Sequence, residues 1–216
     1  MKESEETIMS ILFPPHEFVK VKELLVLYRC ALKNMETRID ILLEDFDNLQ
    51  KHNPIEHIKR RLKSYESIAE KLHRLGHPIT SESARKNLTD IAGLRCICSY
   101  AKDITYLADV FKNQPDMKVI SEKNYVAKPK ASGYRSHHII LEVPIYLTGS
   151  VQRLPVEIQI RTQAMDFWAS LEHKIRYKYK TGMPQHLAEG LRECAEQISD
   201  LDERMYKIQE LIDIAY

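Results

Sequence analysis

Hydrophobic residues recur at helical spacing near both ends of the chain. Between residues 17 and 50, apolar side chains return every three or four positions with charged residues between them, which predicts a long amphipathic helix. Residues 184–216 show the same pattern, so a second long helix is predicted there. Both stripes are long for one domain, and they either cover a sheet or pack against a second copy. Their residues are Phe18, Val21, Leu24, Leu25, Tyr28, Leu32, Met35, Ile39, Leu42 and Leu43, then Leu187, Leu191, Cys194, Ile198, Leu201, Met205, Ile208 and Ile212.

Two helix-capping patterns follow the first stripe. Asn53-Pro54-Ile55-Glu56 offers a cap residue, a proline at the first helical position and a glutamate three residues after the cap, which predicts a short helix over residues 53–60. Ser64 is a second candidate cap, and Gly76-His77-Pro78 ends the helix that it begins. Residues 61–63, between the two caps, are either extended or part of one continuous helix.

The middle of the chain is patterned for β-structure. Strands are predicted at residues 94–100, 118–121, 138–143 and 154–161, and helices at 103–111 and 166–177. Residues 123–136 are polar and contain glycine and lysine, which predicts a long loop of the kind that is usually functional or disordered. The sequence therefore predicts one α+β domain over residues 1–216, a mixed β-sheet flanked by helices.

The composition excludes several classes of protein. The chain is 44% hydrophobic and 29% charged with a net charge of +1, so any basic surface is local, whereas a nonspecific nucleic-acid binder is more basic. No apolar run approaches the roughly 20 residues that span a bilayer, and residues 1–10 lack the features of a signal peptide. Cys96 and Cys98, within an apolar stretch, are expected to be buried thiols. A cytoplasmic protein without membrane or DNA partners is predicted.

The strand predicted at residues 154–161 has one polar and one apolar face. Side chains alternate along a strand, so Glu157, Gln159 and Arg161 share one side. Such a face suits a polar ligand, although a solvent-facing strand has the same pattern. Asp90 lies just ahead of the strand at 94–100. If the two strands are neighbours, Asp90 and Glu157 could share a Mg²⁺, which takes one or two carboxylates plus phosphate oxygens; otherwise Asp90 caps a turn.

Basic residues could form the phosphate-binding side of such a site. Lys63, Ser67 and Lys71 lie at four-residue steps and would share one face of a helix. Arg61 and Arg95 could clamp phosphates or stack on a base. Spaced lysines on a helix are also the usual pattern of a solvated face.

The predicted loop at residues 123–136 combines amines with a tyrosine beside a glycine. Lys128 and Lys130 precede Gly133 and Tyr134, and such a tyrosine can stack on a purine. The loop is not a Walker A motif, and no GxGxxG occurs in the chain. The nine histidines include no HExxH, so a histidine-rich metal centre is not expected.

Five short motifs occur in order within about residues 53–180. They are Arg61-x-Lys63, Asp90-Ile-Ala-Gly-x-Arg95, Gly133-Tyr134-Arg135-Ser-x-His138, Glu157-Ile-Gln-Ile-Arg161 and Trp168-Ala-Ser-Leu-Glu-His173. Together they resemble the synthetase domain of RelA/SpoT-homologue enzymes, and in particular the small alarmone synthetases. The stretches LPVEIQIRT and WASLEHKIRYK are most similar to the RelP branch. The resemblance implies a nucleotidyltransferase-like sheet as a catalytic core at 53–180, with residues 17–50 and 184–216 as helical arms.

The resemblance also implies a reaction: transfer of pyrophosphate from ATP to the 3′-hydroxyl of GDP or GTP, with release of AMP and formation of (p)ppGpp in the stringent response. Asp90 and Glu157 would hold Mg²⁺, and Glu157 or a nearby group would help deprotonate the acceptor hydroxyl. Arg61 and Arg95 would enclose the adenine, while Lys63, Ser67 and Lys71 hold the phosphates of ATP. The residues implied to bind the acceptor are Tyr134, stacked on the guanine, and Lys128, Lys130, His138, Gln159, Arg161 and Asp166.

Three further expectations concern activity and assembly. No His-Asp dipeptide of a hydrolase domain occurs, so synthesis without hydrolysis is expected. The alternatives are a relative that pyrophosphorylates the 3′ end of tRNA as a toxin, and a catalytically dead nucleotide- or RNA-binding module. The family often assembles as homotetramers through its terminal helices, and the long stripes of this chain are compatible with that arrangement.

Overall fold

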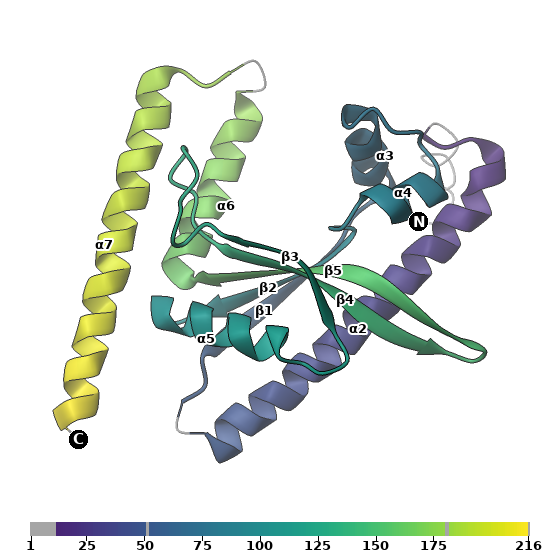
Figure 1. Ribbon diagram of the computed structural model, residues 1–216. Helices are drawn as coiled ribbons and strands as arrows, with labels where there is room; N and C mark the ends of the chain where they lie inside the picture. The colour runs from purple at the N-terminus through teal and green to yellow at the C-terminus, as the bar shows by residue number, and fades with distance from the viewer. Residues whose placement is uncertain (1–11, 51, 180–181, 216) are drawn as a thin grey trace.

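The protein is built around one β-sheet with helices on both faces (Figure 1). A computed structural model describes residues 12–50, 52–179 and 182–215. Its elements are the 3₁₀ helix η1 (Pro15–Glu17), α2 (Phe18–Leu49), β1 (Ile55–Leu62), α3 (Tyr65–Arg74), α4 (Ser81–Asn87), β2 (Ala92–Cys98), α5 (Ala101–Lys112), β3 (Lys118–Asn124), β4 (His137–Leu147), β5 (Ser150–Thr162), α6 (Gln163–Lys178) and α7 (Gln185–Ala215).

The five strands form a mixed sheet in the order β1-β2-β5-β4-β3. Only β2 and β5 run parallel, and the other neighbours are antiparallel. The parallel pair lies at the centre of the sheet, so the stretch that follows Asp90 and the stretch that carries Glu157 are direct neighbours. The predicted fold class, an α+β mixed sheet flanked by helices with long helices at both ends, is confirmed.

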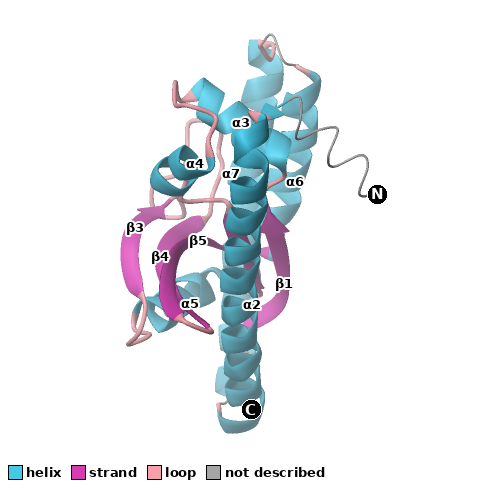
Figure 2. Cartoon of the chain, turned by 90° about the vertical axis from the view of Figure 1, so that its right-hand side faces the viewer, coloured by secondary structure: helices cyan, strands magenta, loops and turns pink. Residues whose placement is uncertain are grey.

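One face of the sheet is apolar and carries the core. Val156, Ile158 and Ile160 of β5 are fully buried and belong to one cluster with the buried stripes of α2 and α5. Figure 2 shows α2 crossing the strands and extending beyond them. The predicted N-terminal stripe therefore covers the sheet, which leaves the opposite, polar face available to a ligand. No helix within the described ranges has a stretch long and apolar enough to cross a membrane.

Most predicted elements are present; three strands are longer than expected, and β2 covers residues 92–98 instead of the predicted 94–100. β3 continues to Asn124, so the predicted loop begins two residues later, and β4 and β5 extend into a hairpin that joins them. Helix α4 was not predicted, because its short polar sequence has no apolar period; the side chain of Thr80 caps it by accepting a hydrogen bond from the Ser83 amide. Cys96 and Cys98 are fully buried as predicted, and burial raises the pKa of Cys96 to about 12.

The helix predicted over residues 53–60 is wrong, because this segment is strand β1. The Asn53 side chain accepts a hydrogen bond from the Ile55 amide, 2.9 Å away, so it forms a local turn instead of capping a helix. Residues 57–62 then pair with β2 in antiparallel register. Pairing with the sheet outweighs a local capping pattern, since local propensity is a weak prior.

The second capping prediction is confirmed. Ser64 Oγ accepts a hydrogen bond from the Ser67 amide at the start of α3, and residues 61–62 are extended. Lys63 consequently precedes the helix, and its predicted place on one helix face with Ser67 and Lys71 is wrong. Lys63 and Lys71 nevertheless both pair with the carboxylate of Asp90.

A buried glutamate ties the N-terminal segment to α4. Glu17 Oε2 accepts hydrogen bonds of 2.7 Å from both the amide and the hydroxyl of Ser81. These hydrogen bonds lower the pKa of Glu17 to about 2. Because the folded pKa lies below its unfolded value near 4.3, the ionised form stabilises the fold above that value, and the contribution is lost as the pH falls toward 2.

Replacing Glu17 by glutamine is expected to lower the free energy of unfolding by about 2 kcal/mol at pH 7. The glutamine side chain is neutral, so the two hydrogen bonds from Ser81 lose their charged acceptor. Urea unfolding at several pH values measures the difference, which should shrink below pH 4 and vanish near pH 2. Glu23→Gln, at an exposed position of α2, is the control and should match the wild type. A deficit that stays constant with pH would contradict the assignment.

Candidate active site

The sheet register brings polar side chains together in cross-strand rows. Glu157 of β5 pairs with Gly93 of β2, and Gly93 pairs with Arg61 of β1. The next row consists of Lys59, Arg95, Gln159 and His138, from four adjacent strands. Paired residues point to the same face of a sheet. The predicted polar face of β5 is therefore confirmed, and neighbouring strands extend it.

Glu157 is held by its neighbours in the second row. Its carboxylate accepts hydrogen bonds from His138 Nδ1 at 3.2 Å and from Gln159 Nε2 at 3.0 Å. Burial raises the pKa of Glu157, but the hydrogen bonds and charge of His138 outweigh that effect and the net pKa is lowered. Glu157 is thus an ionised carboxylate at neutral pH. His138 Nε2 lies 2.8 Å from the Tyr134 hydroxyl, so a hydrogen-bonded chain joins Tyr134 to Glu157.

Asp90 lies between α4 and β2 and pairs with two lysines. Its Oδ2 lies 3.2 Å from Lys63 Nζ and 2.7 Å from Lys71 Nζ. Burial raises the pKa of Asp90, but the two ammonium groups overcome it and the net pKa is lowered. The other oxygen, Oδ1, is buried and has no hydrogen-bond partner. A buried carboxylate oxygen without a donor is a ready ligand for a cation, since unsatisfied buried polar atoms are costly.

The two carboxylates are close enough to affect each other. The negative charge of Asp90 acts to raise the pKa of Glu157, so the two carboxylates are near each other in the folded chain. Gly93 lies between them, and a methyl group there would be 3.9 Å from Glu157 Oε2. Within the described residues, no group of three or more His, Cys, Asp or Glu side chains could hold a metal alone. Two carboxylates fit Mg²⁺ bound together with a polyphosphate, because Mg²⁺ takes its remaining ligands from phosphate and water.

A third carboxylate of the site, the buried Asp166 at the start of α6, pairs with three cations. It lies 2.6 Å from Lys59 Nζ, 2.8 Å from Arg95 Nη1 and 3.4 Å from Arg161 Nη1. Burial raises the pKa of Asp166, but these cations reverse the effect, Lys59 contributing most. Asp166 and its three cations are called the Asp166 clamp below. The clamp fixes Arg95 and Arg161 at the second row of the polar face.

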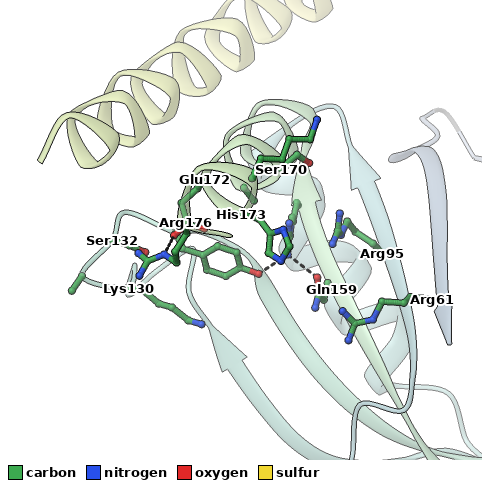
Figure 3. A pocket seen from close by; sticks show the side chains of 14 residues that line it. Arg61, Arg95, Lys130, Ser132, Gln159, Ser170, Glu172, His173 and Arg176 are labelled. Atoms are coloured by element: carbon green, nitrogen blue, oxygen red, sulfur yellow. Dashed lines mark hydrogen bonds and ion pairs between the residues drawn. The ribbon is translucent and has the colours of Figure 1, made fainter. Parts of the chain in front are cut away.

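A cavity of about 880 Å³ opens above this face (Figure 3). The sheet forms its floor, the loop after β3 one wall and helix α6 the other. Its lining residues are Arg61, Arg95, Lys130, Ala131, Ser132, Tyr134, Gln159, Arg161, Ala169, Ser170, Glu172, His173, Lys174 and Arg176. Six of these are Lys or Arg and one is Glu, so the cavity attracts anions strongly although the chain is nearly neutral.

A smaller cavity of about 240 Å³ lies between the two arginines of the first and second rows. Its lining includes Arg61, Arg95 and Gly93, together with Glu157 and Gln159. Two guanidinium groups and a residue without a side chain form a slot suited to a flat aromatic ring. A larger side chain at position 93 would fill that space.

The loop after β3 presents Tyr134 to the large cavity. Its hydroxyl accepts a hydrogen bond from Arg161 Nη2, and the Arg161 guanidinium lies 5.0 Å from its ring centre. Lys130 Nζ lies 4.8 Å from the same ring. These contacts hold the ring at the cavity wall by cation–π interactions.

Not every predicted site residue reaches the cavities. Lys128 is exposed and lines neither of them, and Ser67 Oγ contacts the Ser64 hydroxyl beside the α3 cap. Asp90 pairs with Lys63 and Lys71, and these three residues line neither cavity. The remaining predicted residues line a cavity or bond to a residue that does.

The wall formed by α6 was not predicted as part of the site. Ala169, Glu172, His173 and Arg176 line the cavity at spacings of three and four residues, so one face of the helix contributes. These residues lie in and directly after the motif Trp168-Ala-Ser-Leu-Glu-His173, whose polar positions at helical spacing were the available signal. Lys59 was also missed, because the segment around it was interpreted as a helix.

Comparisons with known proteins agree with this geometry. Residues 60–182 match the family model described as a region found in RelA/SpoT proteins. The GTP pyrophosphokinase YwaC of Bacillus subtilis (strain 168) is 45% identical over 192 residues, which cover 89% of this chain and 91% of the relative. The crystal structure of small alarmone synthetase 2 from Bacillus subtilis matches with a TM-score of 0.80 at 44% identity, over 88% of this chain and 97% of the other. Small alarmone synthetase 1 from the same organism, bound to its product pppGpp, matches with a TM-score of 0.81 at 34% identity over the same shares.

Proposed function

Because the chain belongs to the RelA/SpoT family, we propose that it is a (p)ppGpp synthetase, with Asp90 and Glu157 at the catalytic centre. It transfers pyrophosphate from ATP to the 3′-hydroxyl of GDP or GTP and releases AMP. The observation that carries this assignment to particular residues is the ionised carboxylate of Glu157, which lines the smaller cationic cavity. Asp90 lies three residues before Gly93, the strand partner of Glu157. Phosphoryl-type transfer depends on positioning and charge neutralisation, which such a site provides.

Asp90 and Glu157 are the residues that would hold Mg²⁺. Bound there, the ion would polarise the ATP phosphates and offset the charge that develops on them. The buried, unpartnered Oδ1 of Asp90 and the ionised carboxylate of Glu157 both support this role.

The ATP side of the site comprises the slot and the two lysines of Asp90. Adenine fits between Arg61 and Arg95 over Gly93. Lys63 and Lys71, 3.2 and 2.7 Å from Asp90, then exchange part of their contact with the carboxylate for contact with phosphate oxygens. Their charges stabilise the β-phosphoryl group and the leaving AMP.

The acceptor side is the larger cavity. The guanine stacks on Tyr134 near Asp166, and Gln159, Arg161 and His138 lie beside the ribose and phosphates. The 3′-oxygen forms a bond to the β-phosphorus as the bond between that phosphorus and the bridging oxygen to AMP breaks. Glu157 accepts the proton of the 3′-hydroxyl, and His138, 3.2 Å away, holds the carboxylate in place.

Nucleotide chromatography tests the function directly. Purified protein with ATP and Mg²⁺ should convert GDP to ppGpp and GTP to pppGpp, and should release one AMP for each alarmone formed. With ATP labelled at the β-phosphate, deacylated tRNA should stay unlabelled. Labelled tRNA without labelled guanosine nucleotides would replace the proposal by the toxin activity. Absence of AMP release with every acceptor would leave only nucleotide binding.

We further propose that the enzyme synthesises (p)ppGpp without hydrolysing it, acts in the cytoplasm and forms a homotetramer. Leu201, Met205, Ile208, Leu211 and Ile212 of α7 have exposed fractions between 48% and 68%, which supports assembly through this helix. The similarity of this sequence to the RelP branch of the small alarmone synthetases is part of the same proposal.

A further inference from the structure

Helix α7 reaches the acceptor side of the cavity through a small apolar cluster. Trp168 and Ala169 of α6 and Ala195 of α7 are 4%, 8% and 5% exposed, and Tyr134 packs against them. The Trp168 indole donates a 2.9 Å hydrogen bond to the Leu191 carbonyl of α7. In Figure 1, α6 and α7 lie side by side with the loop after β3 next to them. Three segments distant in sequence therefore meet directly behind the cavity wall.

The closest of these contacts joins the loop to α7. Gly133, next to Tyr134, has a φ of +88°, and a Cβ added to it would lie only 2.6 Å from Ala195 Cβ. Gly133 and Ala195 also line a cavity of about 250 Å³ beside this contact. The backbone of the loop thus rests directly against the Ala195 methyl, with open space next to the two residues.

The turn transmits the position of Gly133 to Tyr134. The Gly133 amide donates to the Lys130 carbonyl at 2.8 Å, and the Lys130 amide donates to the Tyr134 carbonyl at 3.1 Å. The far end of the Tyr134 ring is bonded to Arg161 and His138. The ring is consequently fixed at its hydroxyl by the sheet and at its backbone by α7.

α7 itself is anchored, so it can act as a support. The Thr162 hydroxyl, at the cap of α6, is hydrogen-bonded to Asp202, and the Tyr100 hydroxyl donates to Gln209 at 3.0 Å. Both contacts lie C-terminal to Ala195 on the same helix.

We propose that Ala195 is a positioning residue for the acceptor nucleotide: its methyl group holds Gly133, and through it the Tyr134 ring, at the wall of the cavity. The C-terminal helix is then part of the acceptor site. The inference rests on the proposed function, since it takes the guanine to stack on Tyr134.

Enlarging Ala195 to valine tests it. The added methyl groups crowd the contact with the Gly133 backbone and displace the loop toward the cavity beside it, so the KM for GTP should rise about tenfold while the KM for ATP changes less than about twofold. Ala188→Val, at an exposed position of the same helix, has the same helix-propensity cost and should behave like the wild type. Ala195→Ser, a smaller addition, should give an intermediate KM for GTP, and it decides the question if the valine variant fails to fold.

Binding provides a readout independent of turnover. Trp168 is the only tryptophan in the chain and lies in the cluster, so its fluorescence should report GDP binding without ATP. The affinity for GDP should fall in the order wild type, Ala195→Ser, Ala195→Val. Equal KM and GDP affinity in all variants, or a parallel loss for ATP and GTP, would overturn the inference while the proposed function stands. A wild-type protein that makes no (p)ppGpp would instead refute the function.

Discussion

Replacing Glu157 by glutamine is expected to lower kcat for pppGpp synthesis by roughly 10³-fold and to leave the KM for each nucleotide within about threefold. The amide keeps the shape of the side chain and can still bond to Gln159, but it loses the charge that would hold the metal and the oxygen that would take the proton. Steady-state kinetics with ATP and GTP measures both constants. Glu70→Gln, an exposed carboxylate of α3, is the control and should retain wild-type rates.

Asp90→Asn should share this loss of kcat with a distinct effect on ATP. Lys63 and Lys71 lose their counter-ion when Asp90 is neutralised, and both become available to phosphates. ATP binding measured without Mg²⁺ should therefore be retained or tightened while turnover is lost. A variant with weaker ATP binding and normal kcat would show that Asp90 merely holds the lysines in place.

The sequence predicted the polar face of β5 well because its signal is local to one strand. Alternation alone put Glu157, Gln159 and Arg161 on one side, and burial of the intervening residues confirms it. The adjacency of Asp90 depends on β2 and β5 being parallel neighbours, a long-range pairing that no short window contains. The family motifs supplied that link.

The misses share a physical cause: tertiary contacts overrode local patterns. The capping sequence at residues 53–56 was satisfied by a turn, and the edge of the sheet took the following residues into β1. Lys63 and Lys71 converge through Asp90 and not through a shared helix face. The support of the loop by Ala195 has no sequence signal, because alanine on an amphipathic helix is unremarkable until Gly133 is seen against it.

Five cations of the site are paired with two of the protein's own carboxylates. Asp90 takes Lys63 and Lys71, and Asp166 takes Lys59, Arg95 and Arg161. These pairs offset much of the positive charge of the site. Arg95 lines both cavities and contacts Asp166, so the Asp166 clamp links the two cavities.

Removing the carboxylate of the clamp should therefore cost stability as well as activity. Asp166→Ala is expected to lower the free energy of unfolding by about 3 kcal/mol, because Arg161, only 4% exposed, keeps a buried charge without its anion. Lys59 adds little to that figure, since its side chain is 52% exposed and water screens the pair. Urea unfolding at pH 7 measures the loss.

The matched control is Asp109→Ala, which breaks a surface pair with Lys112 in which the aspartate is 55% exposed. That change should cost less than about 1 kcal/mol. Equal losses in the two variants would mean that the three cations around Asp166 are satisfied by other groups. Arg161 would then rest on its hydrogen bonds to Ser136, Gln159 and Tyr134, and Asp166 would serve the nucleotide alone.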